Sequence, residues 1–445
     1  MTGVGQAGNR VEVLVAGAGV AGIGVARRAA EHGLRTLVLE ASPRIGGTCG
    51  GFRAGGWRFD LGLHCFFTRL PAIASHINEV MGADHREQPL RELVRYDGRW
   101  RPYPPLRNLA AYPGPFRIGP GAPAPAAGGS GAQIVRAEAG DDLAQRFVLP
   151  QLACYWGQDP DLLPPAAVRI GGLVPRAEIE AGLRAPLDDP PARTWHYPCS
   201  GGFVRYVERI GEKVPVRVRA AVRHVDTGRR QVVIADGRTM AYHQLASSIP
   251  LPDLAAMADG MPAQLVKRIQ ALPHSSVTLV SLCVSAVSPP APWVYSLGAD
   301  VPWFRAVFPA EVDPGAAPSS AARAPTAAVQ TETYWSGQRP QAARLAESVR
   351  ASLFRLGLLP AGSRVLLADV RDIRYASTLA GEDDLDAIAE AVDWLAERGV
   401  SCVGRYGSWD NARFDQALDR AYSLADRLAG SGAGQAGRVG AGGRG

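Results

Sequence analysis

The sequence VEVLVAGAGVAG, residues 11–22, decides the fold. It opens with an apolar run that is typical of a buried parallel strand. Gly17, Gly19 and Gly22 follow, and a helical pattern runs from Val20 to His32. The first glycine allows a tight turn, the second lets the backbone approach a pyrophosphate, and the third lets helix and sheet pack closely. Because a helix N-terminus also attracts phosphate, this stretch predicts a dinucleotide-binding unit.

The next apolar run, Thr36 to Leu39, adds a second strand and ends at Glu40, eighteen residues after Gly22. A carboxylate at that place accepts hydrogen bonds from ribose hydroxyls and repels a 2′-phosphate. Strand and helix alternate here, which favours a parallel sheet. We therefore predict an α/β fold, with a Rossmann-type sheet that carries the dinucleotide and a second α+β domain for a substrate.

A second glycine-rich segment, ASPRIGGTCGGF, occupies residues 41–52 and contains Arg44 and the pair Gly46-Gly47. NAD dehydrogenases need no glycine pair at this place. FAD enzymes of the amine oxidase and glutathione reductase type carry one, because their longer cofactor continues past the second strand. The segment therefore predicts FAD as the cofactor, held without a covalent bond.

Two further segments carry a family resemblance: GGWRFDLGLHCFF, residues 55–67, and VGRYGSWDNARFDQAL, residues 403–418. With residues 11–52 they resemble the FAD-dependent amine oxidase / protoporphyrinogen oxidase superfamily, in the branch that contains UDP-galactopyranose mutase. The resemblance implies that His64 lies near the flavin N5 edge and Arg405 near the ribityl-pyrophosphate chain, and we predict both as catalytic. Motifs and resemblance together predict these cofactor-binding residues: Gly17, Gly19, Val20, Ala21, Gly22, Glu40, Ala41, Arg44, Gly46, Gly47, Thr48, Leu63, His64, Val222, Val225, Gly404, Arg405, Phe414 and Asp415.

The middle of the chain departs from the mutases. The segment Trp156-Gly157 resembles part of their substrate domain, where a tyrosine, a threonine and a lysine precede the tryptophan. This chain has instead Gln151, Leu152 and Cys154. A nucleotide-stacking tyrosine and a phosphate-binding cation are therefore missing. We predict Trp156 and Trp335 as substrate-binding residues, within a wider set of aromatic candidates that also includes Trp293, Tyr295, Trp303 and Phe304.

Three functions fit these motifs. The first is an FAD-dependent oxidoreductase that moves a hydride between flavin N5 and a small molecule, in a specialised-metabolite or sugar-related pathway. The alternative is a sugar-nucleotide mutase that uses reduced FAD, in which Arg405, with Arg69, Arg169 or Arg305, holds a diphosphate. A third is a flavin-binding protein without catalysis. The substrate, the electron acceptor and the oligomeric state stay open.

Composition excludes other classes of protein. The formal net charge is +6, and the chain has 48 Lys plus Arg, of which only Lys213 and Lys267 are lysines. Heavy use of Ala, Gly, Pro and Arg indicates a bacterial genome rich in GC, so the arginine excess does not predict nucleic-acid binding. Six scattered cysteines lack metal-ligand spacing and predict reduced thiols, no metal site and a cytoplasmic protein. No apolar run is long enough to span a membrane.

The motifs divide the chain into interleaved segments. We predict the FAD-binding domain from residues 1–70, 191–262 and 396–430. The substrate domain takes residues 71–190, with a low-complexity loop at 119–134, and residues 263–395. A second Ala/Pro-rich loop is predicted at 310–326, and a disordered tail follows the last helix, at residues 431–445.

Overall fold

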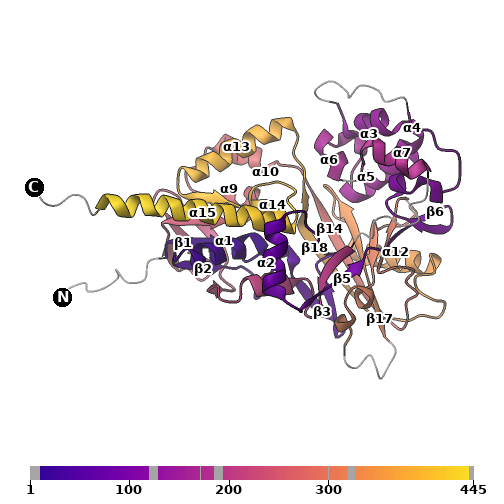
Figure 1. Ribbon diagram of the computed structural model, residues 1–445, viewed down its shortest axis with the longest axis horizontal. Helices are drawn as coiled ribbons and strands as arrows, with labels where there is room; N and C mark the ends of the chain where they lie inside the picture. The colour runs from indigo at the N-terminus through magenta and orange to yellow at the C-terminus, as the bar shows by residue number, and fades with distance from the viewer. Residues whose placement is uncertain are drawn as a thin grey trace, which may run out of the picture.

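Two large sheets, one parallel and one mixed, organise the chain (Figure 1). The computed structural model describes residues 11–119, 129–170, 172–184, 194–298, 300–318 and 326–439. The parallel sheet and its helices form one end of the molecule, where both termini lie, and the mixed sheet with a group of helices forms the other (Figure 1). A cleft beside the parallel sheet is lined by residues from both ends of the chain.

The parallel sheet has five strands in the order β19-β13-β1-β2-β9. Its central strand, β1 (Val13–Ala16), is buried along its whole length, which explains the apolar run in the sequence. All four pairings in the sheet are parallel. The other strands come from three separate regions of the chain: β2 (Thr36–Leu39), β9 (Val216–Arg217), β13 (Gln244–Ser247) and β19 (Val400–Cys402).

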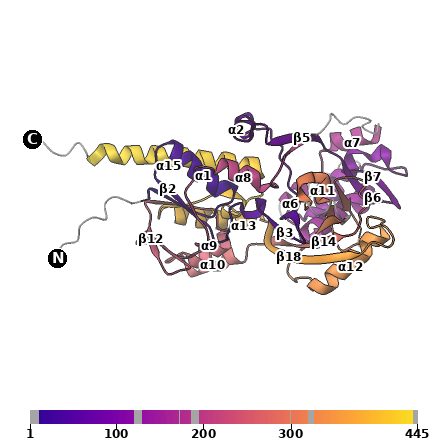
Figure 2. The same cartoon turned by 90° about the horizontal axis from the view of Figure 1, so that it is seen from below.

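Helices cover both faces of this sheet, as Figure 2 shows from below. One face carries α1 (Val20–Glu31) and α15 (Phe414–Val439). The two helices touch closely, because a Cβ atom on Gly24 would lie only 2.9 Å from Leu418 Cδ1. The opposite face packs against the β10–β12 sheet and three helices: β10 (Val222–Asp226), β11 (Gln231–Ile234), β12 (Thr239–Ala241), α9 (Leu251–Met257), α10 (Ala263–Gln270) and α13 (Glu382–Ala396).

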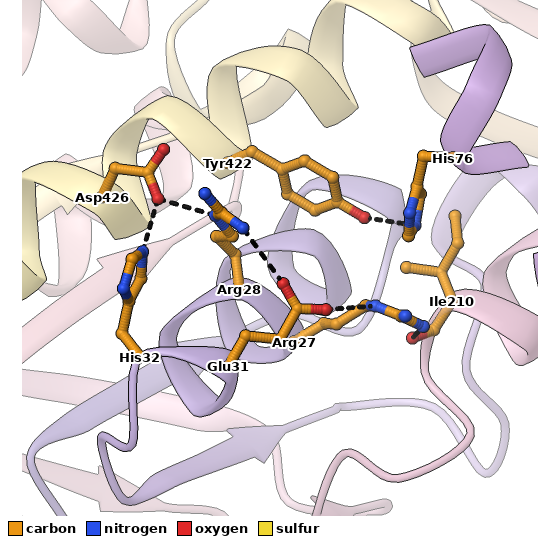
Figure 3. Close-up of polar contacts among 8 residues, drawn as sticks. All are labelled: Arg27, Arg28, Glu31, His32, His76, Ile210, Tyr422 and Asp426. Carbon is orange, nitrogen blue, oxygen red and sulfur yellow. Dashed lines mark hydrogen bonds and ion pairs between the residues drawn. The ribbon is translucent and has the colours of Figure 1, made fainter. Parts of the chain in front are cut away.

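Polar contacts also hold the C-terminal helix on α1 (Figure 3). Asp426 of α15 accepts a hydrogen bond from Arg28 Nε of α1 at 2.7 Å and contacts Nε2 of His32, the residue directly after α1, at 2.6 Å. Tyr422 of α15 reaches His76 Nε2 on α2 (Pro71–Met81) at 2.6 Å. These contacts fix the start of α15 beside the glycine-rich turn that precedes α1.

The second sheet has seven strands in the order β18-β14-β17-β16-β15-β6-β7, and only the β15–β6 pair is parallel. Helix α12 (Ala342–Arg355) covers one of its faces through an apolar cluster. The strands are β6 (Glu92–Tyr96), β7 (Arg99–Pro102), β14 (His274–Val284), β15 (Trp293–Ser296), β16 (Arg305–Val307), β17 (Ala327–Trp335) and β18 (Val365–Thr378).

Smaller elements connect the two sheets. The hairpin of β3 (Gly51–Ala54) and β4 (Trp57–Asp60) packs Phe52 and Phe59 against Cys283 of β14. A two-stranded ribbon pairs β5 (His85–Pro89) with β8 (Thr194–Pro198). The remaining α-helices are α3 (Gly131–Ala139), α4 (Asp141–Leu143), α5 (Leu149–Trp156), α6 (Pro165–Ile170), α7 (Arg176–Arg184), α8 (Val204–Ile210), α11 (Pro309–Val312) and α14 (Gly404–Gly407).

The structure corrects the expected loops. Helix α3 begins at Gly131, inside the segment expected as a loop, because Ser130 and Gln133 form a capping box. Helix α11, Pro309–Val312, overlaps the first three residues of the second expected loop. Helix α15 continues to Val439, beyond the expected start of the tail. The rest of these segments, residues 120–128, 319–325 and 440–445, lies outside the described residues, and the domain boundaries stay predictions.

No helix among the described residues is long and apolar enough to cross a membrane. All six cysteines are free thiols, of which Cys49 and Cys283 are buried and Cys199 is exposed. Within the described part of the chain, no group of three or more His, Cys, Asp and Glu side chains could hold a metal ion.

Candidate functional site

The glycine-rich turn after β1 has no room for side chains. A Cβ atom on Gly22 would lie 1.9 Å from the carbonyl oxygen of Gly17, and one on Gly17 would lie 2.3 Å from Ser248 Oγ. Gly17 also has a φ of +98°, which favours glycine. No side chain caps the N-terminus of α1, and its first turn has no acidic residue. Its first N–H groups are therefore left for an anionic ligand.

Glu40 holds this turn in place. Its carboxylate accepts hydrogen bonds from Ala18 N at 2.7 Å and from Ser42 N at 2.8 Å. It is 9% exposed and lines the cleft. Because a carboxylate has about four lone-pair sites, two of them stay available to other donors, such as ribose hydroxyls.

A cleft of about 340 Å³ brings the two ends of the chain together. Gly46 donates its N–H to Ala18 O at 2.9 Å, so the second glycine pair lies directly over the turn before α1. Gly404, with a φ of +81°, approaches the same helix, and a Cβ on it would lie 2.7 Å from Ala21 Cβ. The lining residues are Gly17, Gly19, Val20, Ala21, Glu40, Gly46, Gly47, Thr48, Cys49, His64, Ser248, Pro250, Gly404, Arg405, Tyr406, Ala412, Arg413, Phe414 and Ala417.

Arg405 brings a buried positive charge to this cleft. Its Nε donates to Ala412 O at 3.0 Å and its Nη1 donates to Ala376 O at 3.4 Å. Among the described residues, none of its contacts is an ion pair with a carboxylate. The guanidinium is therefore fixed in position by carbonyl groups while its charge stays available to an anion.

His64 lies on the loop after β4, at the wall of the cleft. Its Nδ1 contacts Gly62 O at 3.1 Å, and its ring stacks on Phe203 with 5.0 Å between the ring centroids. Burial lowers the pKa of His64 to about 4, so the ring is neutral at pH 7. A carbonyl oxygen can only accept, so Nδ1 carries the proton and Nε2 is left as an acceptor.

Glu332 of β17 anchors the loop that carries His64. It is 1% exposed, and its Oε1 accepts from Leu63 N at 2.6 Å. Its Oε2 accepts from Arg305 Nη2 at 2.5 Å and from Tyr334 OH at 2.9 Å. The sequence analysis missed Glu332, and its signal was a lone acid within the otherwise uncharged strand AAVQTETYW.

The other predicted site residues lie outside the lining of this cleft. Arg44 lines a neighbouring cleft that shares Gly47 with it, and Ala41 is exposed. Leu63 lines a small cavity beside His64. Val222 and Val225 pack in the core beneath the parallel sheet. The carboxylate of Asp415 is buried and accepts from Thr68 Oγ1 at 2.9 Å.

The two predicted substrate-binding tryptophans lie outside the lining of the cleft, and both make hydrogen bonds within the protein. Trp156 is fully buried, and its indole N–H donates to Ala167 O at 3.2 Å. Trp335 donates to Thr278 Oγ1 at 3.0 Å. Gly157 packs against the backbone of Trp335, where a Cβ atom would lie 2.3 Å from Trp335 Cα. Helix α5 and strand β17 therefore pack closely at these two residues, and their substrate-binding role stays a prediction.

Fold and cleft together define a protein with a Rossmann-like dinucleotide-binding domain joined to a second sheet. Residues 15–80 match the family described as NAD(P)-binding Rossmann-like domain. No curated protein is significantly similar to this chain in sequence.

Solved structures match the fold of nearly the whole chain. Reduced UDP-galactopyranose mutase has a TM-score of 0.82 and 19% identity, covering 95% of this chain and 94% of that chain. Cyclohexylamine oxidase from Brevibacterium oxydans IH-35A has a TM-score of 0.64 and 15% identity, covering 95% and 99%. A fatty acid isomerase from P. acnes has a TM-score of 0.64 and 14% identity, covering 94% and 98%. The predicted fold class and the predicted resemblance are therefore confirmed at the level of fold.

Proposed function

We propose that this chain binds FAD and is an FAD-dependent oxidoreductase that moves a hydride between the flavin and a small-molecule substrate. The observation that supports it best is the cleft where the turn before α1, His64 and Arg405 meet. The fold alone does not decide the reaction, because the similar structures include a mutase, an isomerase and an oxidase. The side chains must therefore carry the argument.

The residues of the cleft fit FAD. The free N–H groups at the start of α1 and the side-chain-free surface of Gly17 and Gly19 suit a diphosphate. Glu40 can accept hydrogen bonds from the ribose hydroxyls of the adenosine half. Arg405 adds a fixed cation for the ribityl-pyrophosphate chain. When bound, the flavin supplies the hydride acceptor and donor. His64 adds a neutral ring whose Nε2 can take up or release a proton at the edge of the cleft.

The mutase alternative needs arginine side chains that are free to hold a sugar-nucleotide diphosphate. Two of the four candidate arginines already form ion pairs with glutamates. Arg305 is buried in an ion pair with Glu332 at 2.5 Å. Arg169 forms an exposed ion pair with Glu138 at 2.6 Å. With the missing tyrosine and lysine of the mutases, these pairings favour the oxidoreductase. Its pathway, specialised-metabolite or sugar-related, and a cytoplasmic location are proposed with it.

The test begins with the absorbance spectrum of the purified protein, which we expect to be yellow with FAD released on denaturation. Anaerobic titration with amines and sugar nucleotides then separates the functions. An oxidoreductase substrate bleaches the flavin directly, whereas a mutase turns over only after the flavin has been reduced beforehand. A flavin that stays oxidised with every compound, and no turnover after reduction, would support a binding protein without catalysis.

A charge reversal tests the adenosine end of the site. Glu40→Arg removes the hydrogen bonds to Ala18 and Ser42 and places a cation among donors, so FAD content should fall at least tenfold. Glu212→Arg, at an exposed position, is the matched control. A folded Glu40→Arg protein with the FAD content of the control would remove this assignment, and a folded wild-type protein that takes up no flavin would refute the whole proposal.

A further inference from the structure

Three hollows lie in a row along the segment from Asp60 to His64. The first is a surface cleft of about 650 Å³, whose walls include Asp60 and Arg58. The second is a small cavity of about 30 Å³, whose walls include Asp60, Tyr197 and His64. The third is the proposed flavin cleft, which His64 also lines. Asp60 thus lines both the first and the second hollow, and His64 lines both the second and the third.

Asp60 is held by donors at the end of β4. It accepts a hydrogen bond from Tyr197 OH, and Phe203 N lies 3.3 and 3.4 Å from its two oxygens. Burial raises the pKa of Asp60 to about 6, against the opposing effects of Tyr197 and Phe203. Near neutral pH the carboxyl group therefore exists in both protonation states, as a group that passes protons requires.

The cavity between the two side chains suits water. A water molecule needs about 10–15 Å³ and two to four polar partners, so this space of about 30 Å³ has room for one or two molecules. Asp313, which pairs with Arg58, contributes polar groups to its wall. Gln330 also lines it and donates to the carbonyl oxygen of Asp60 at 3.1 Å.

Phe203 links the two ends of the cavity. Its backbone N–H points to the Asp60 carboxylate, and its ring stacks on His64. The His64 ring has its Nδ1 proton directed to Gly62 O, which leaves Nε2 as the acceptor. The acceptor and the titrating acid are therefore both fixed by the same short segment before α8.

We propose that Asp60 exchanges protons between the surface cleft and His64, through water in the small cavity, so that the flavin edge is supplied with protons by a route separate from the flavin cleft. Its use in catalysis rests on the proposed function. The Asp60 O–H bond breaks, a proton passes along the water, and a bond from hydrogen to His64 Nε2 forms. Asp60 regains a proton from water in the surface cleft. His64 returns to neutrality when its Nε2–H bond breaks and the proton passes to a base in the flavin cleft, while the Nδ1 proton stays directed to Gly62 O.

The two pKa values favour the proton on Asp60 and make its transfer to His64 unfavourable at equilibrium. The pKa of His64 is lowered to about 4, below that of Asp60 at about 6. Two pKa units correspond to a ratio of about 100 in favour of protonated Asp60, so the imidazolium is a short-lived carrier and not a resting state. The charged and titratable groups that face Asp60 are Arg58, Tyr197 and Asp313, and those that face His64 are Glu332, Arg305 and Arg405.

The first measurement needs no flavin. Infrared difference spectra between pH 5 and pH 8 report the protonation of buried carboxyl groups. We expect a carboxyl band that titrates near pH 6 in the wild type and disappears in Asp60→Asn. Asp253→Asn is the matched control, because Asp253 also accepts from a tyrosine, Tyr375 OH, at 2.9 Å. A wild-type protein without such a band would overturn the proposal.

The second measurement uses the FAD-loaded protein, after its FAD content has been shown to match the wild type. We expect a flavin reduction or reoxidation step whose rate has an inflection near pH 6, and Asp60→Asn should lose the inflection and slow that step at least tenfold. Tyr197→Phe should move the inflection to higher pH, because the tyrosine hydrogen bond lowers the pKa of Asp60. An unchanged pH profile in both variants overturns the proton route while leaving the flavin assignment intact, and a colourless protein refutes the proposed function instead.

Discussion

Removal of Glu332 gives the sharpest test of how the loop with His64 is held. Glu332→Ala deletes the acceptor of Leu63 N and removes the carboxylate partner of Arg305. The Arg305 side chain is only 15% exposed, so its charge would be buried and unpaired. Breaking a buried pair by removing one partner costs about 3–5 kcal/mol, most of it from the charge left unpaired. We therefore expect Glu332→Ala to lower the free energy of unfolding by about 4 kcal/mol, at the middle of that range.

The assay is chemical unfolding followed by circular dichroism and intrinsic fluorescence. Double substitution of Arg305→Met with Glu332→Leu should recover most of the loss, because both charges are then absent. Glu347→Ala is the control, since its ion pair with Arg350 at 2.6 Å is on the surface, and it should leave stability unchanged. If Glu332→Ala matched this control, or if the double variant were less stable than Glu332→Ala, the reasoning would be refuted.

Three further predictions test the site and the fold. Gly22→Ala should abolish FAD retention, because the new Cβ atom would lie 1.9 Å from Gly17 O. Gly430→Ala is the control and should retain FAD, because a Cβ atom there meets nothing within 4 Å. Equal flavin content in the two variants would contradict this prediction. The pKa of His64 is lowered to about 4 in the folded protein, against about 6.5 in the unfolded chain, so neutral His64 costs no stability above pH 6.5. As the pH falls from 6.5 toward 4, the unfolded chain takes up the proton first, and the free energy of unfolding decreases. His64→Gln should remove this decrease, as measured by chemical unfolding at pH 4, 5.5 and 7. Ser130→Ala removes the capping box of α3 and should cost about 1 kcal/mol of stability, with no effect on flavin content.

Local patterns were enough to predict the elements around the glycine-rich turn. The expected helix from Val20 to His32 is α1, which ends at Glu31, and the expected strand Thr36–Leu39 is β2. These elements follow from apolar periodicity and from glycines whose role depends on neighbours a few residues away. The expected start of the tail was wrong. Gly and Ala after residue 428 indicated disorder, yet the chain continues α15 to Val439.

Contacts across long stretches of sequence escaped prediction. Glu332 lies 269 residues from Leu63, and no periodicity links a strand residue to a distant loop. Trp156 carries a family likeness, but its burial depends on how α5 packs. The order of Asp60 and His64 along three hollows exists only once β4, β8 and β17 have come together.

The sequence by itself determined the dinucleotide-binding unit, because turns, strands and helix starts obey short-range steric and hydrogen-bonding rules. It also determined that residues near 20 and near 405 share one site, since the family likeness covers both ends. Only the tertiary structure decided which charges are already paired, which aromatic side chains are core and where water can lie. Burial and pairing depend on the packing of segments far apart in the chain, and a linear pattern does not encode that packing residue by residue.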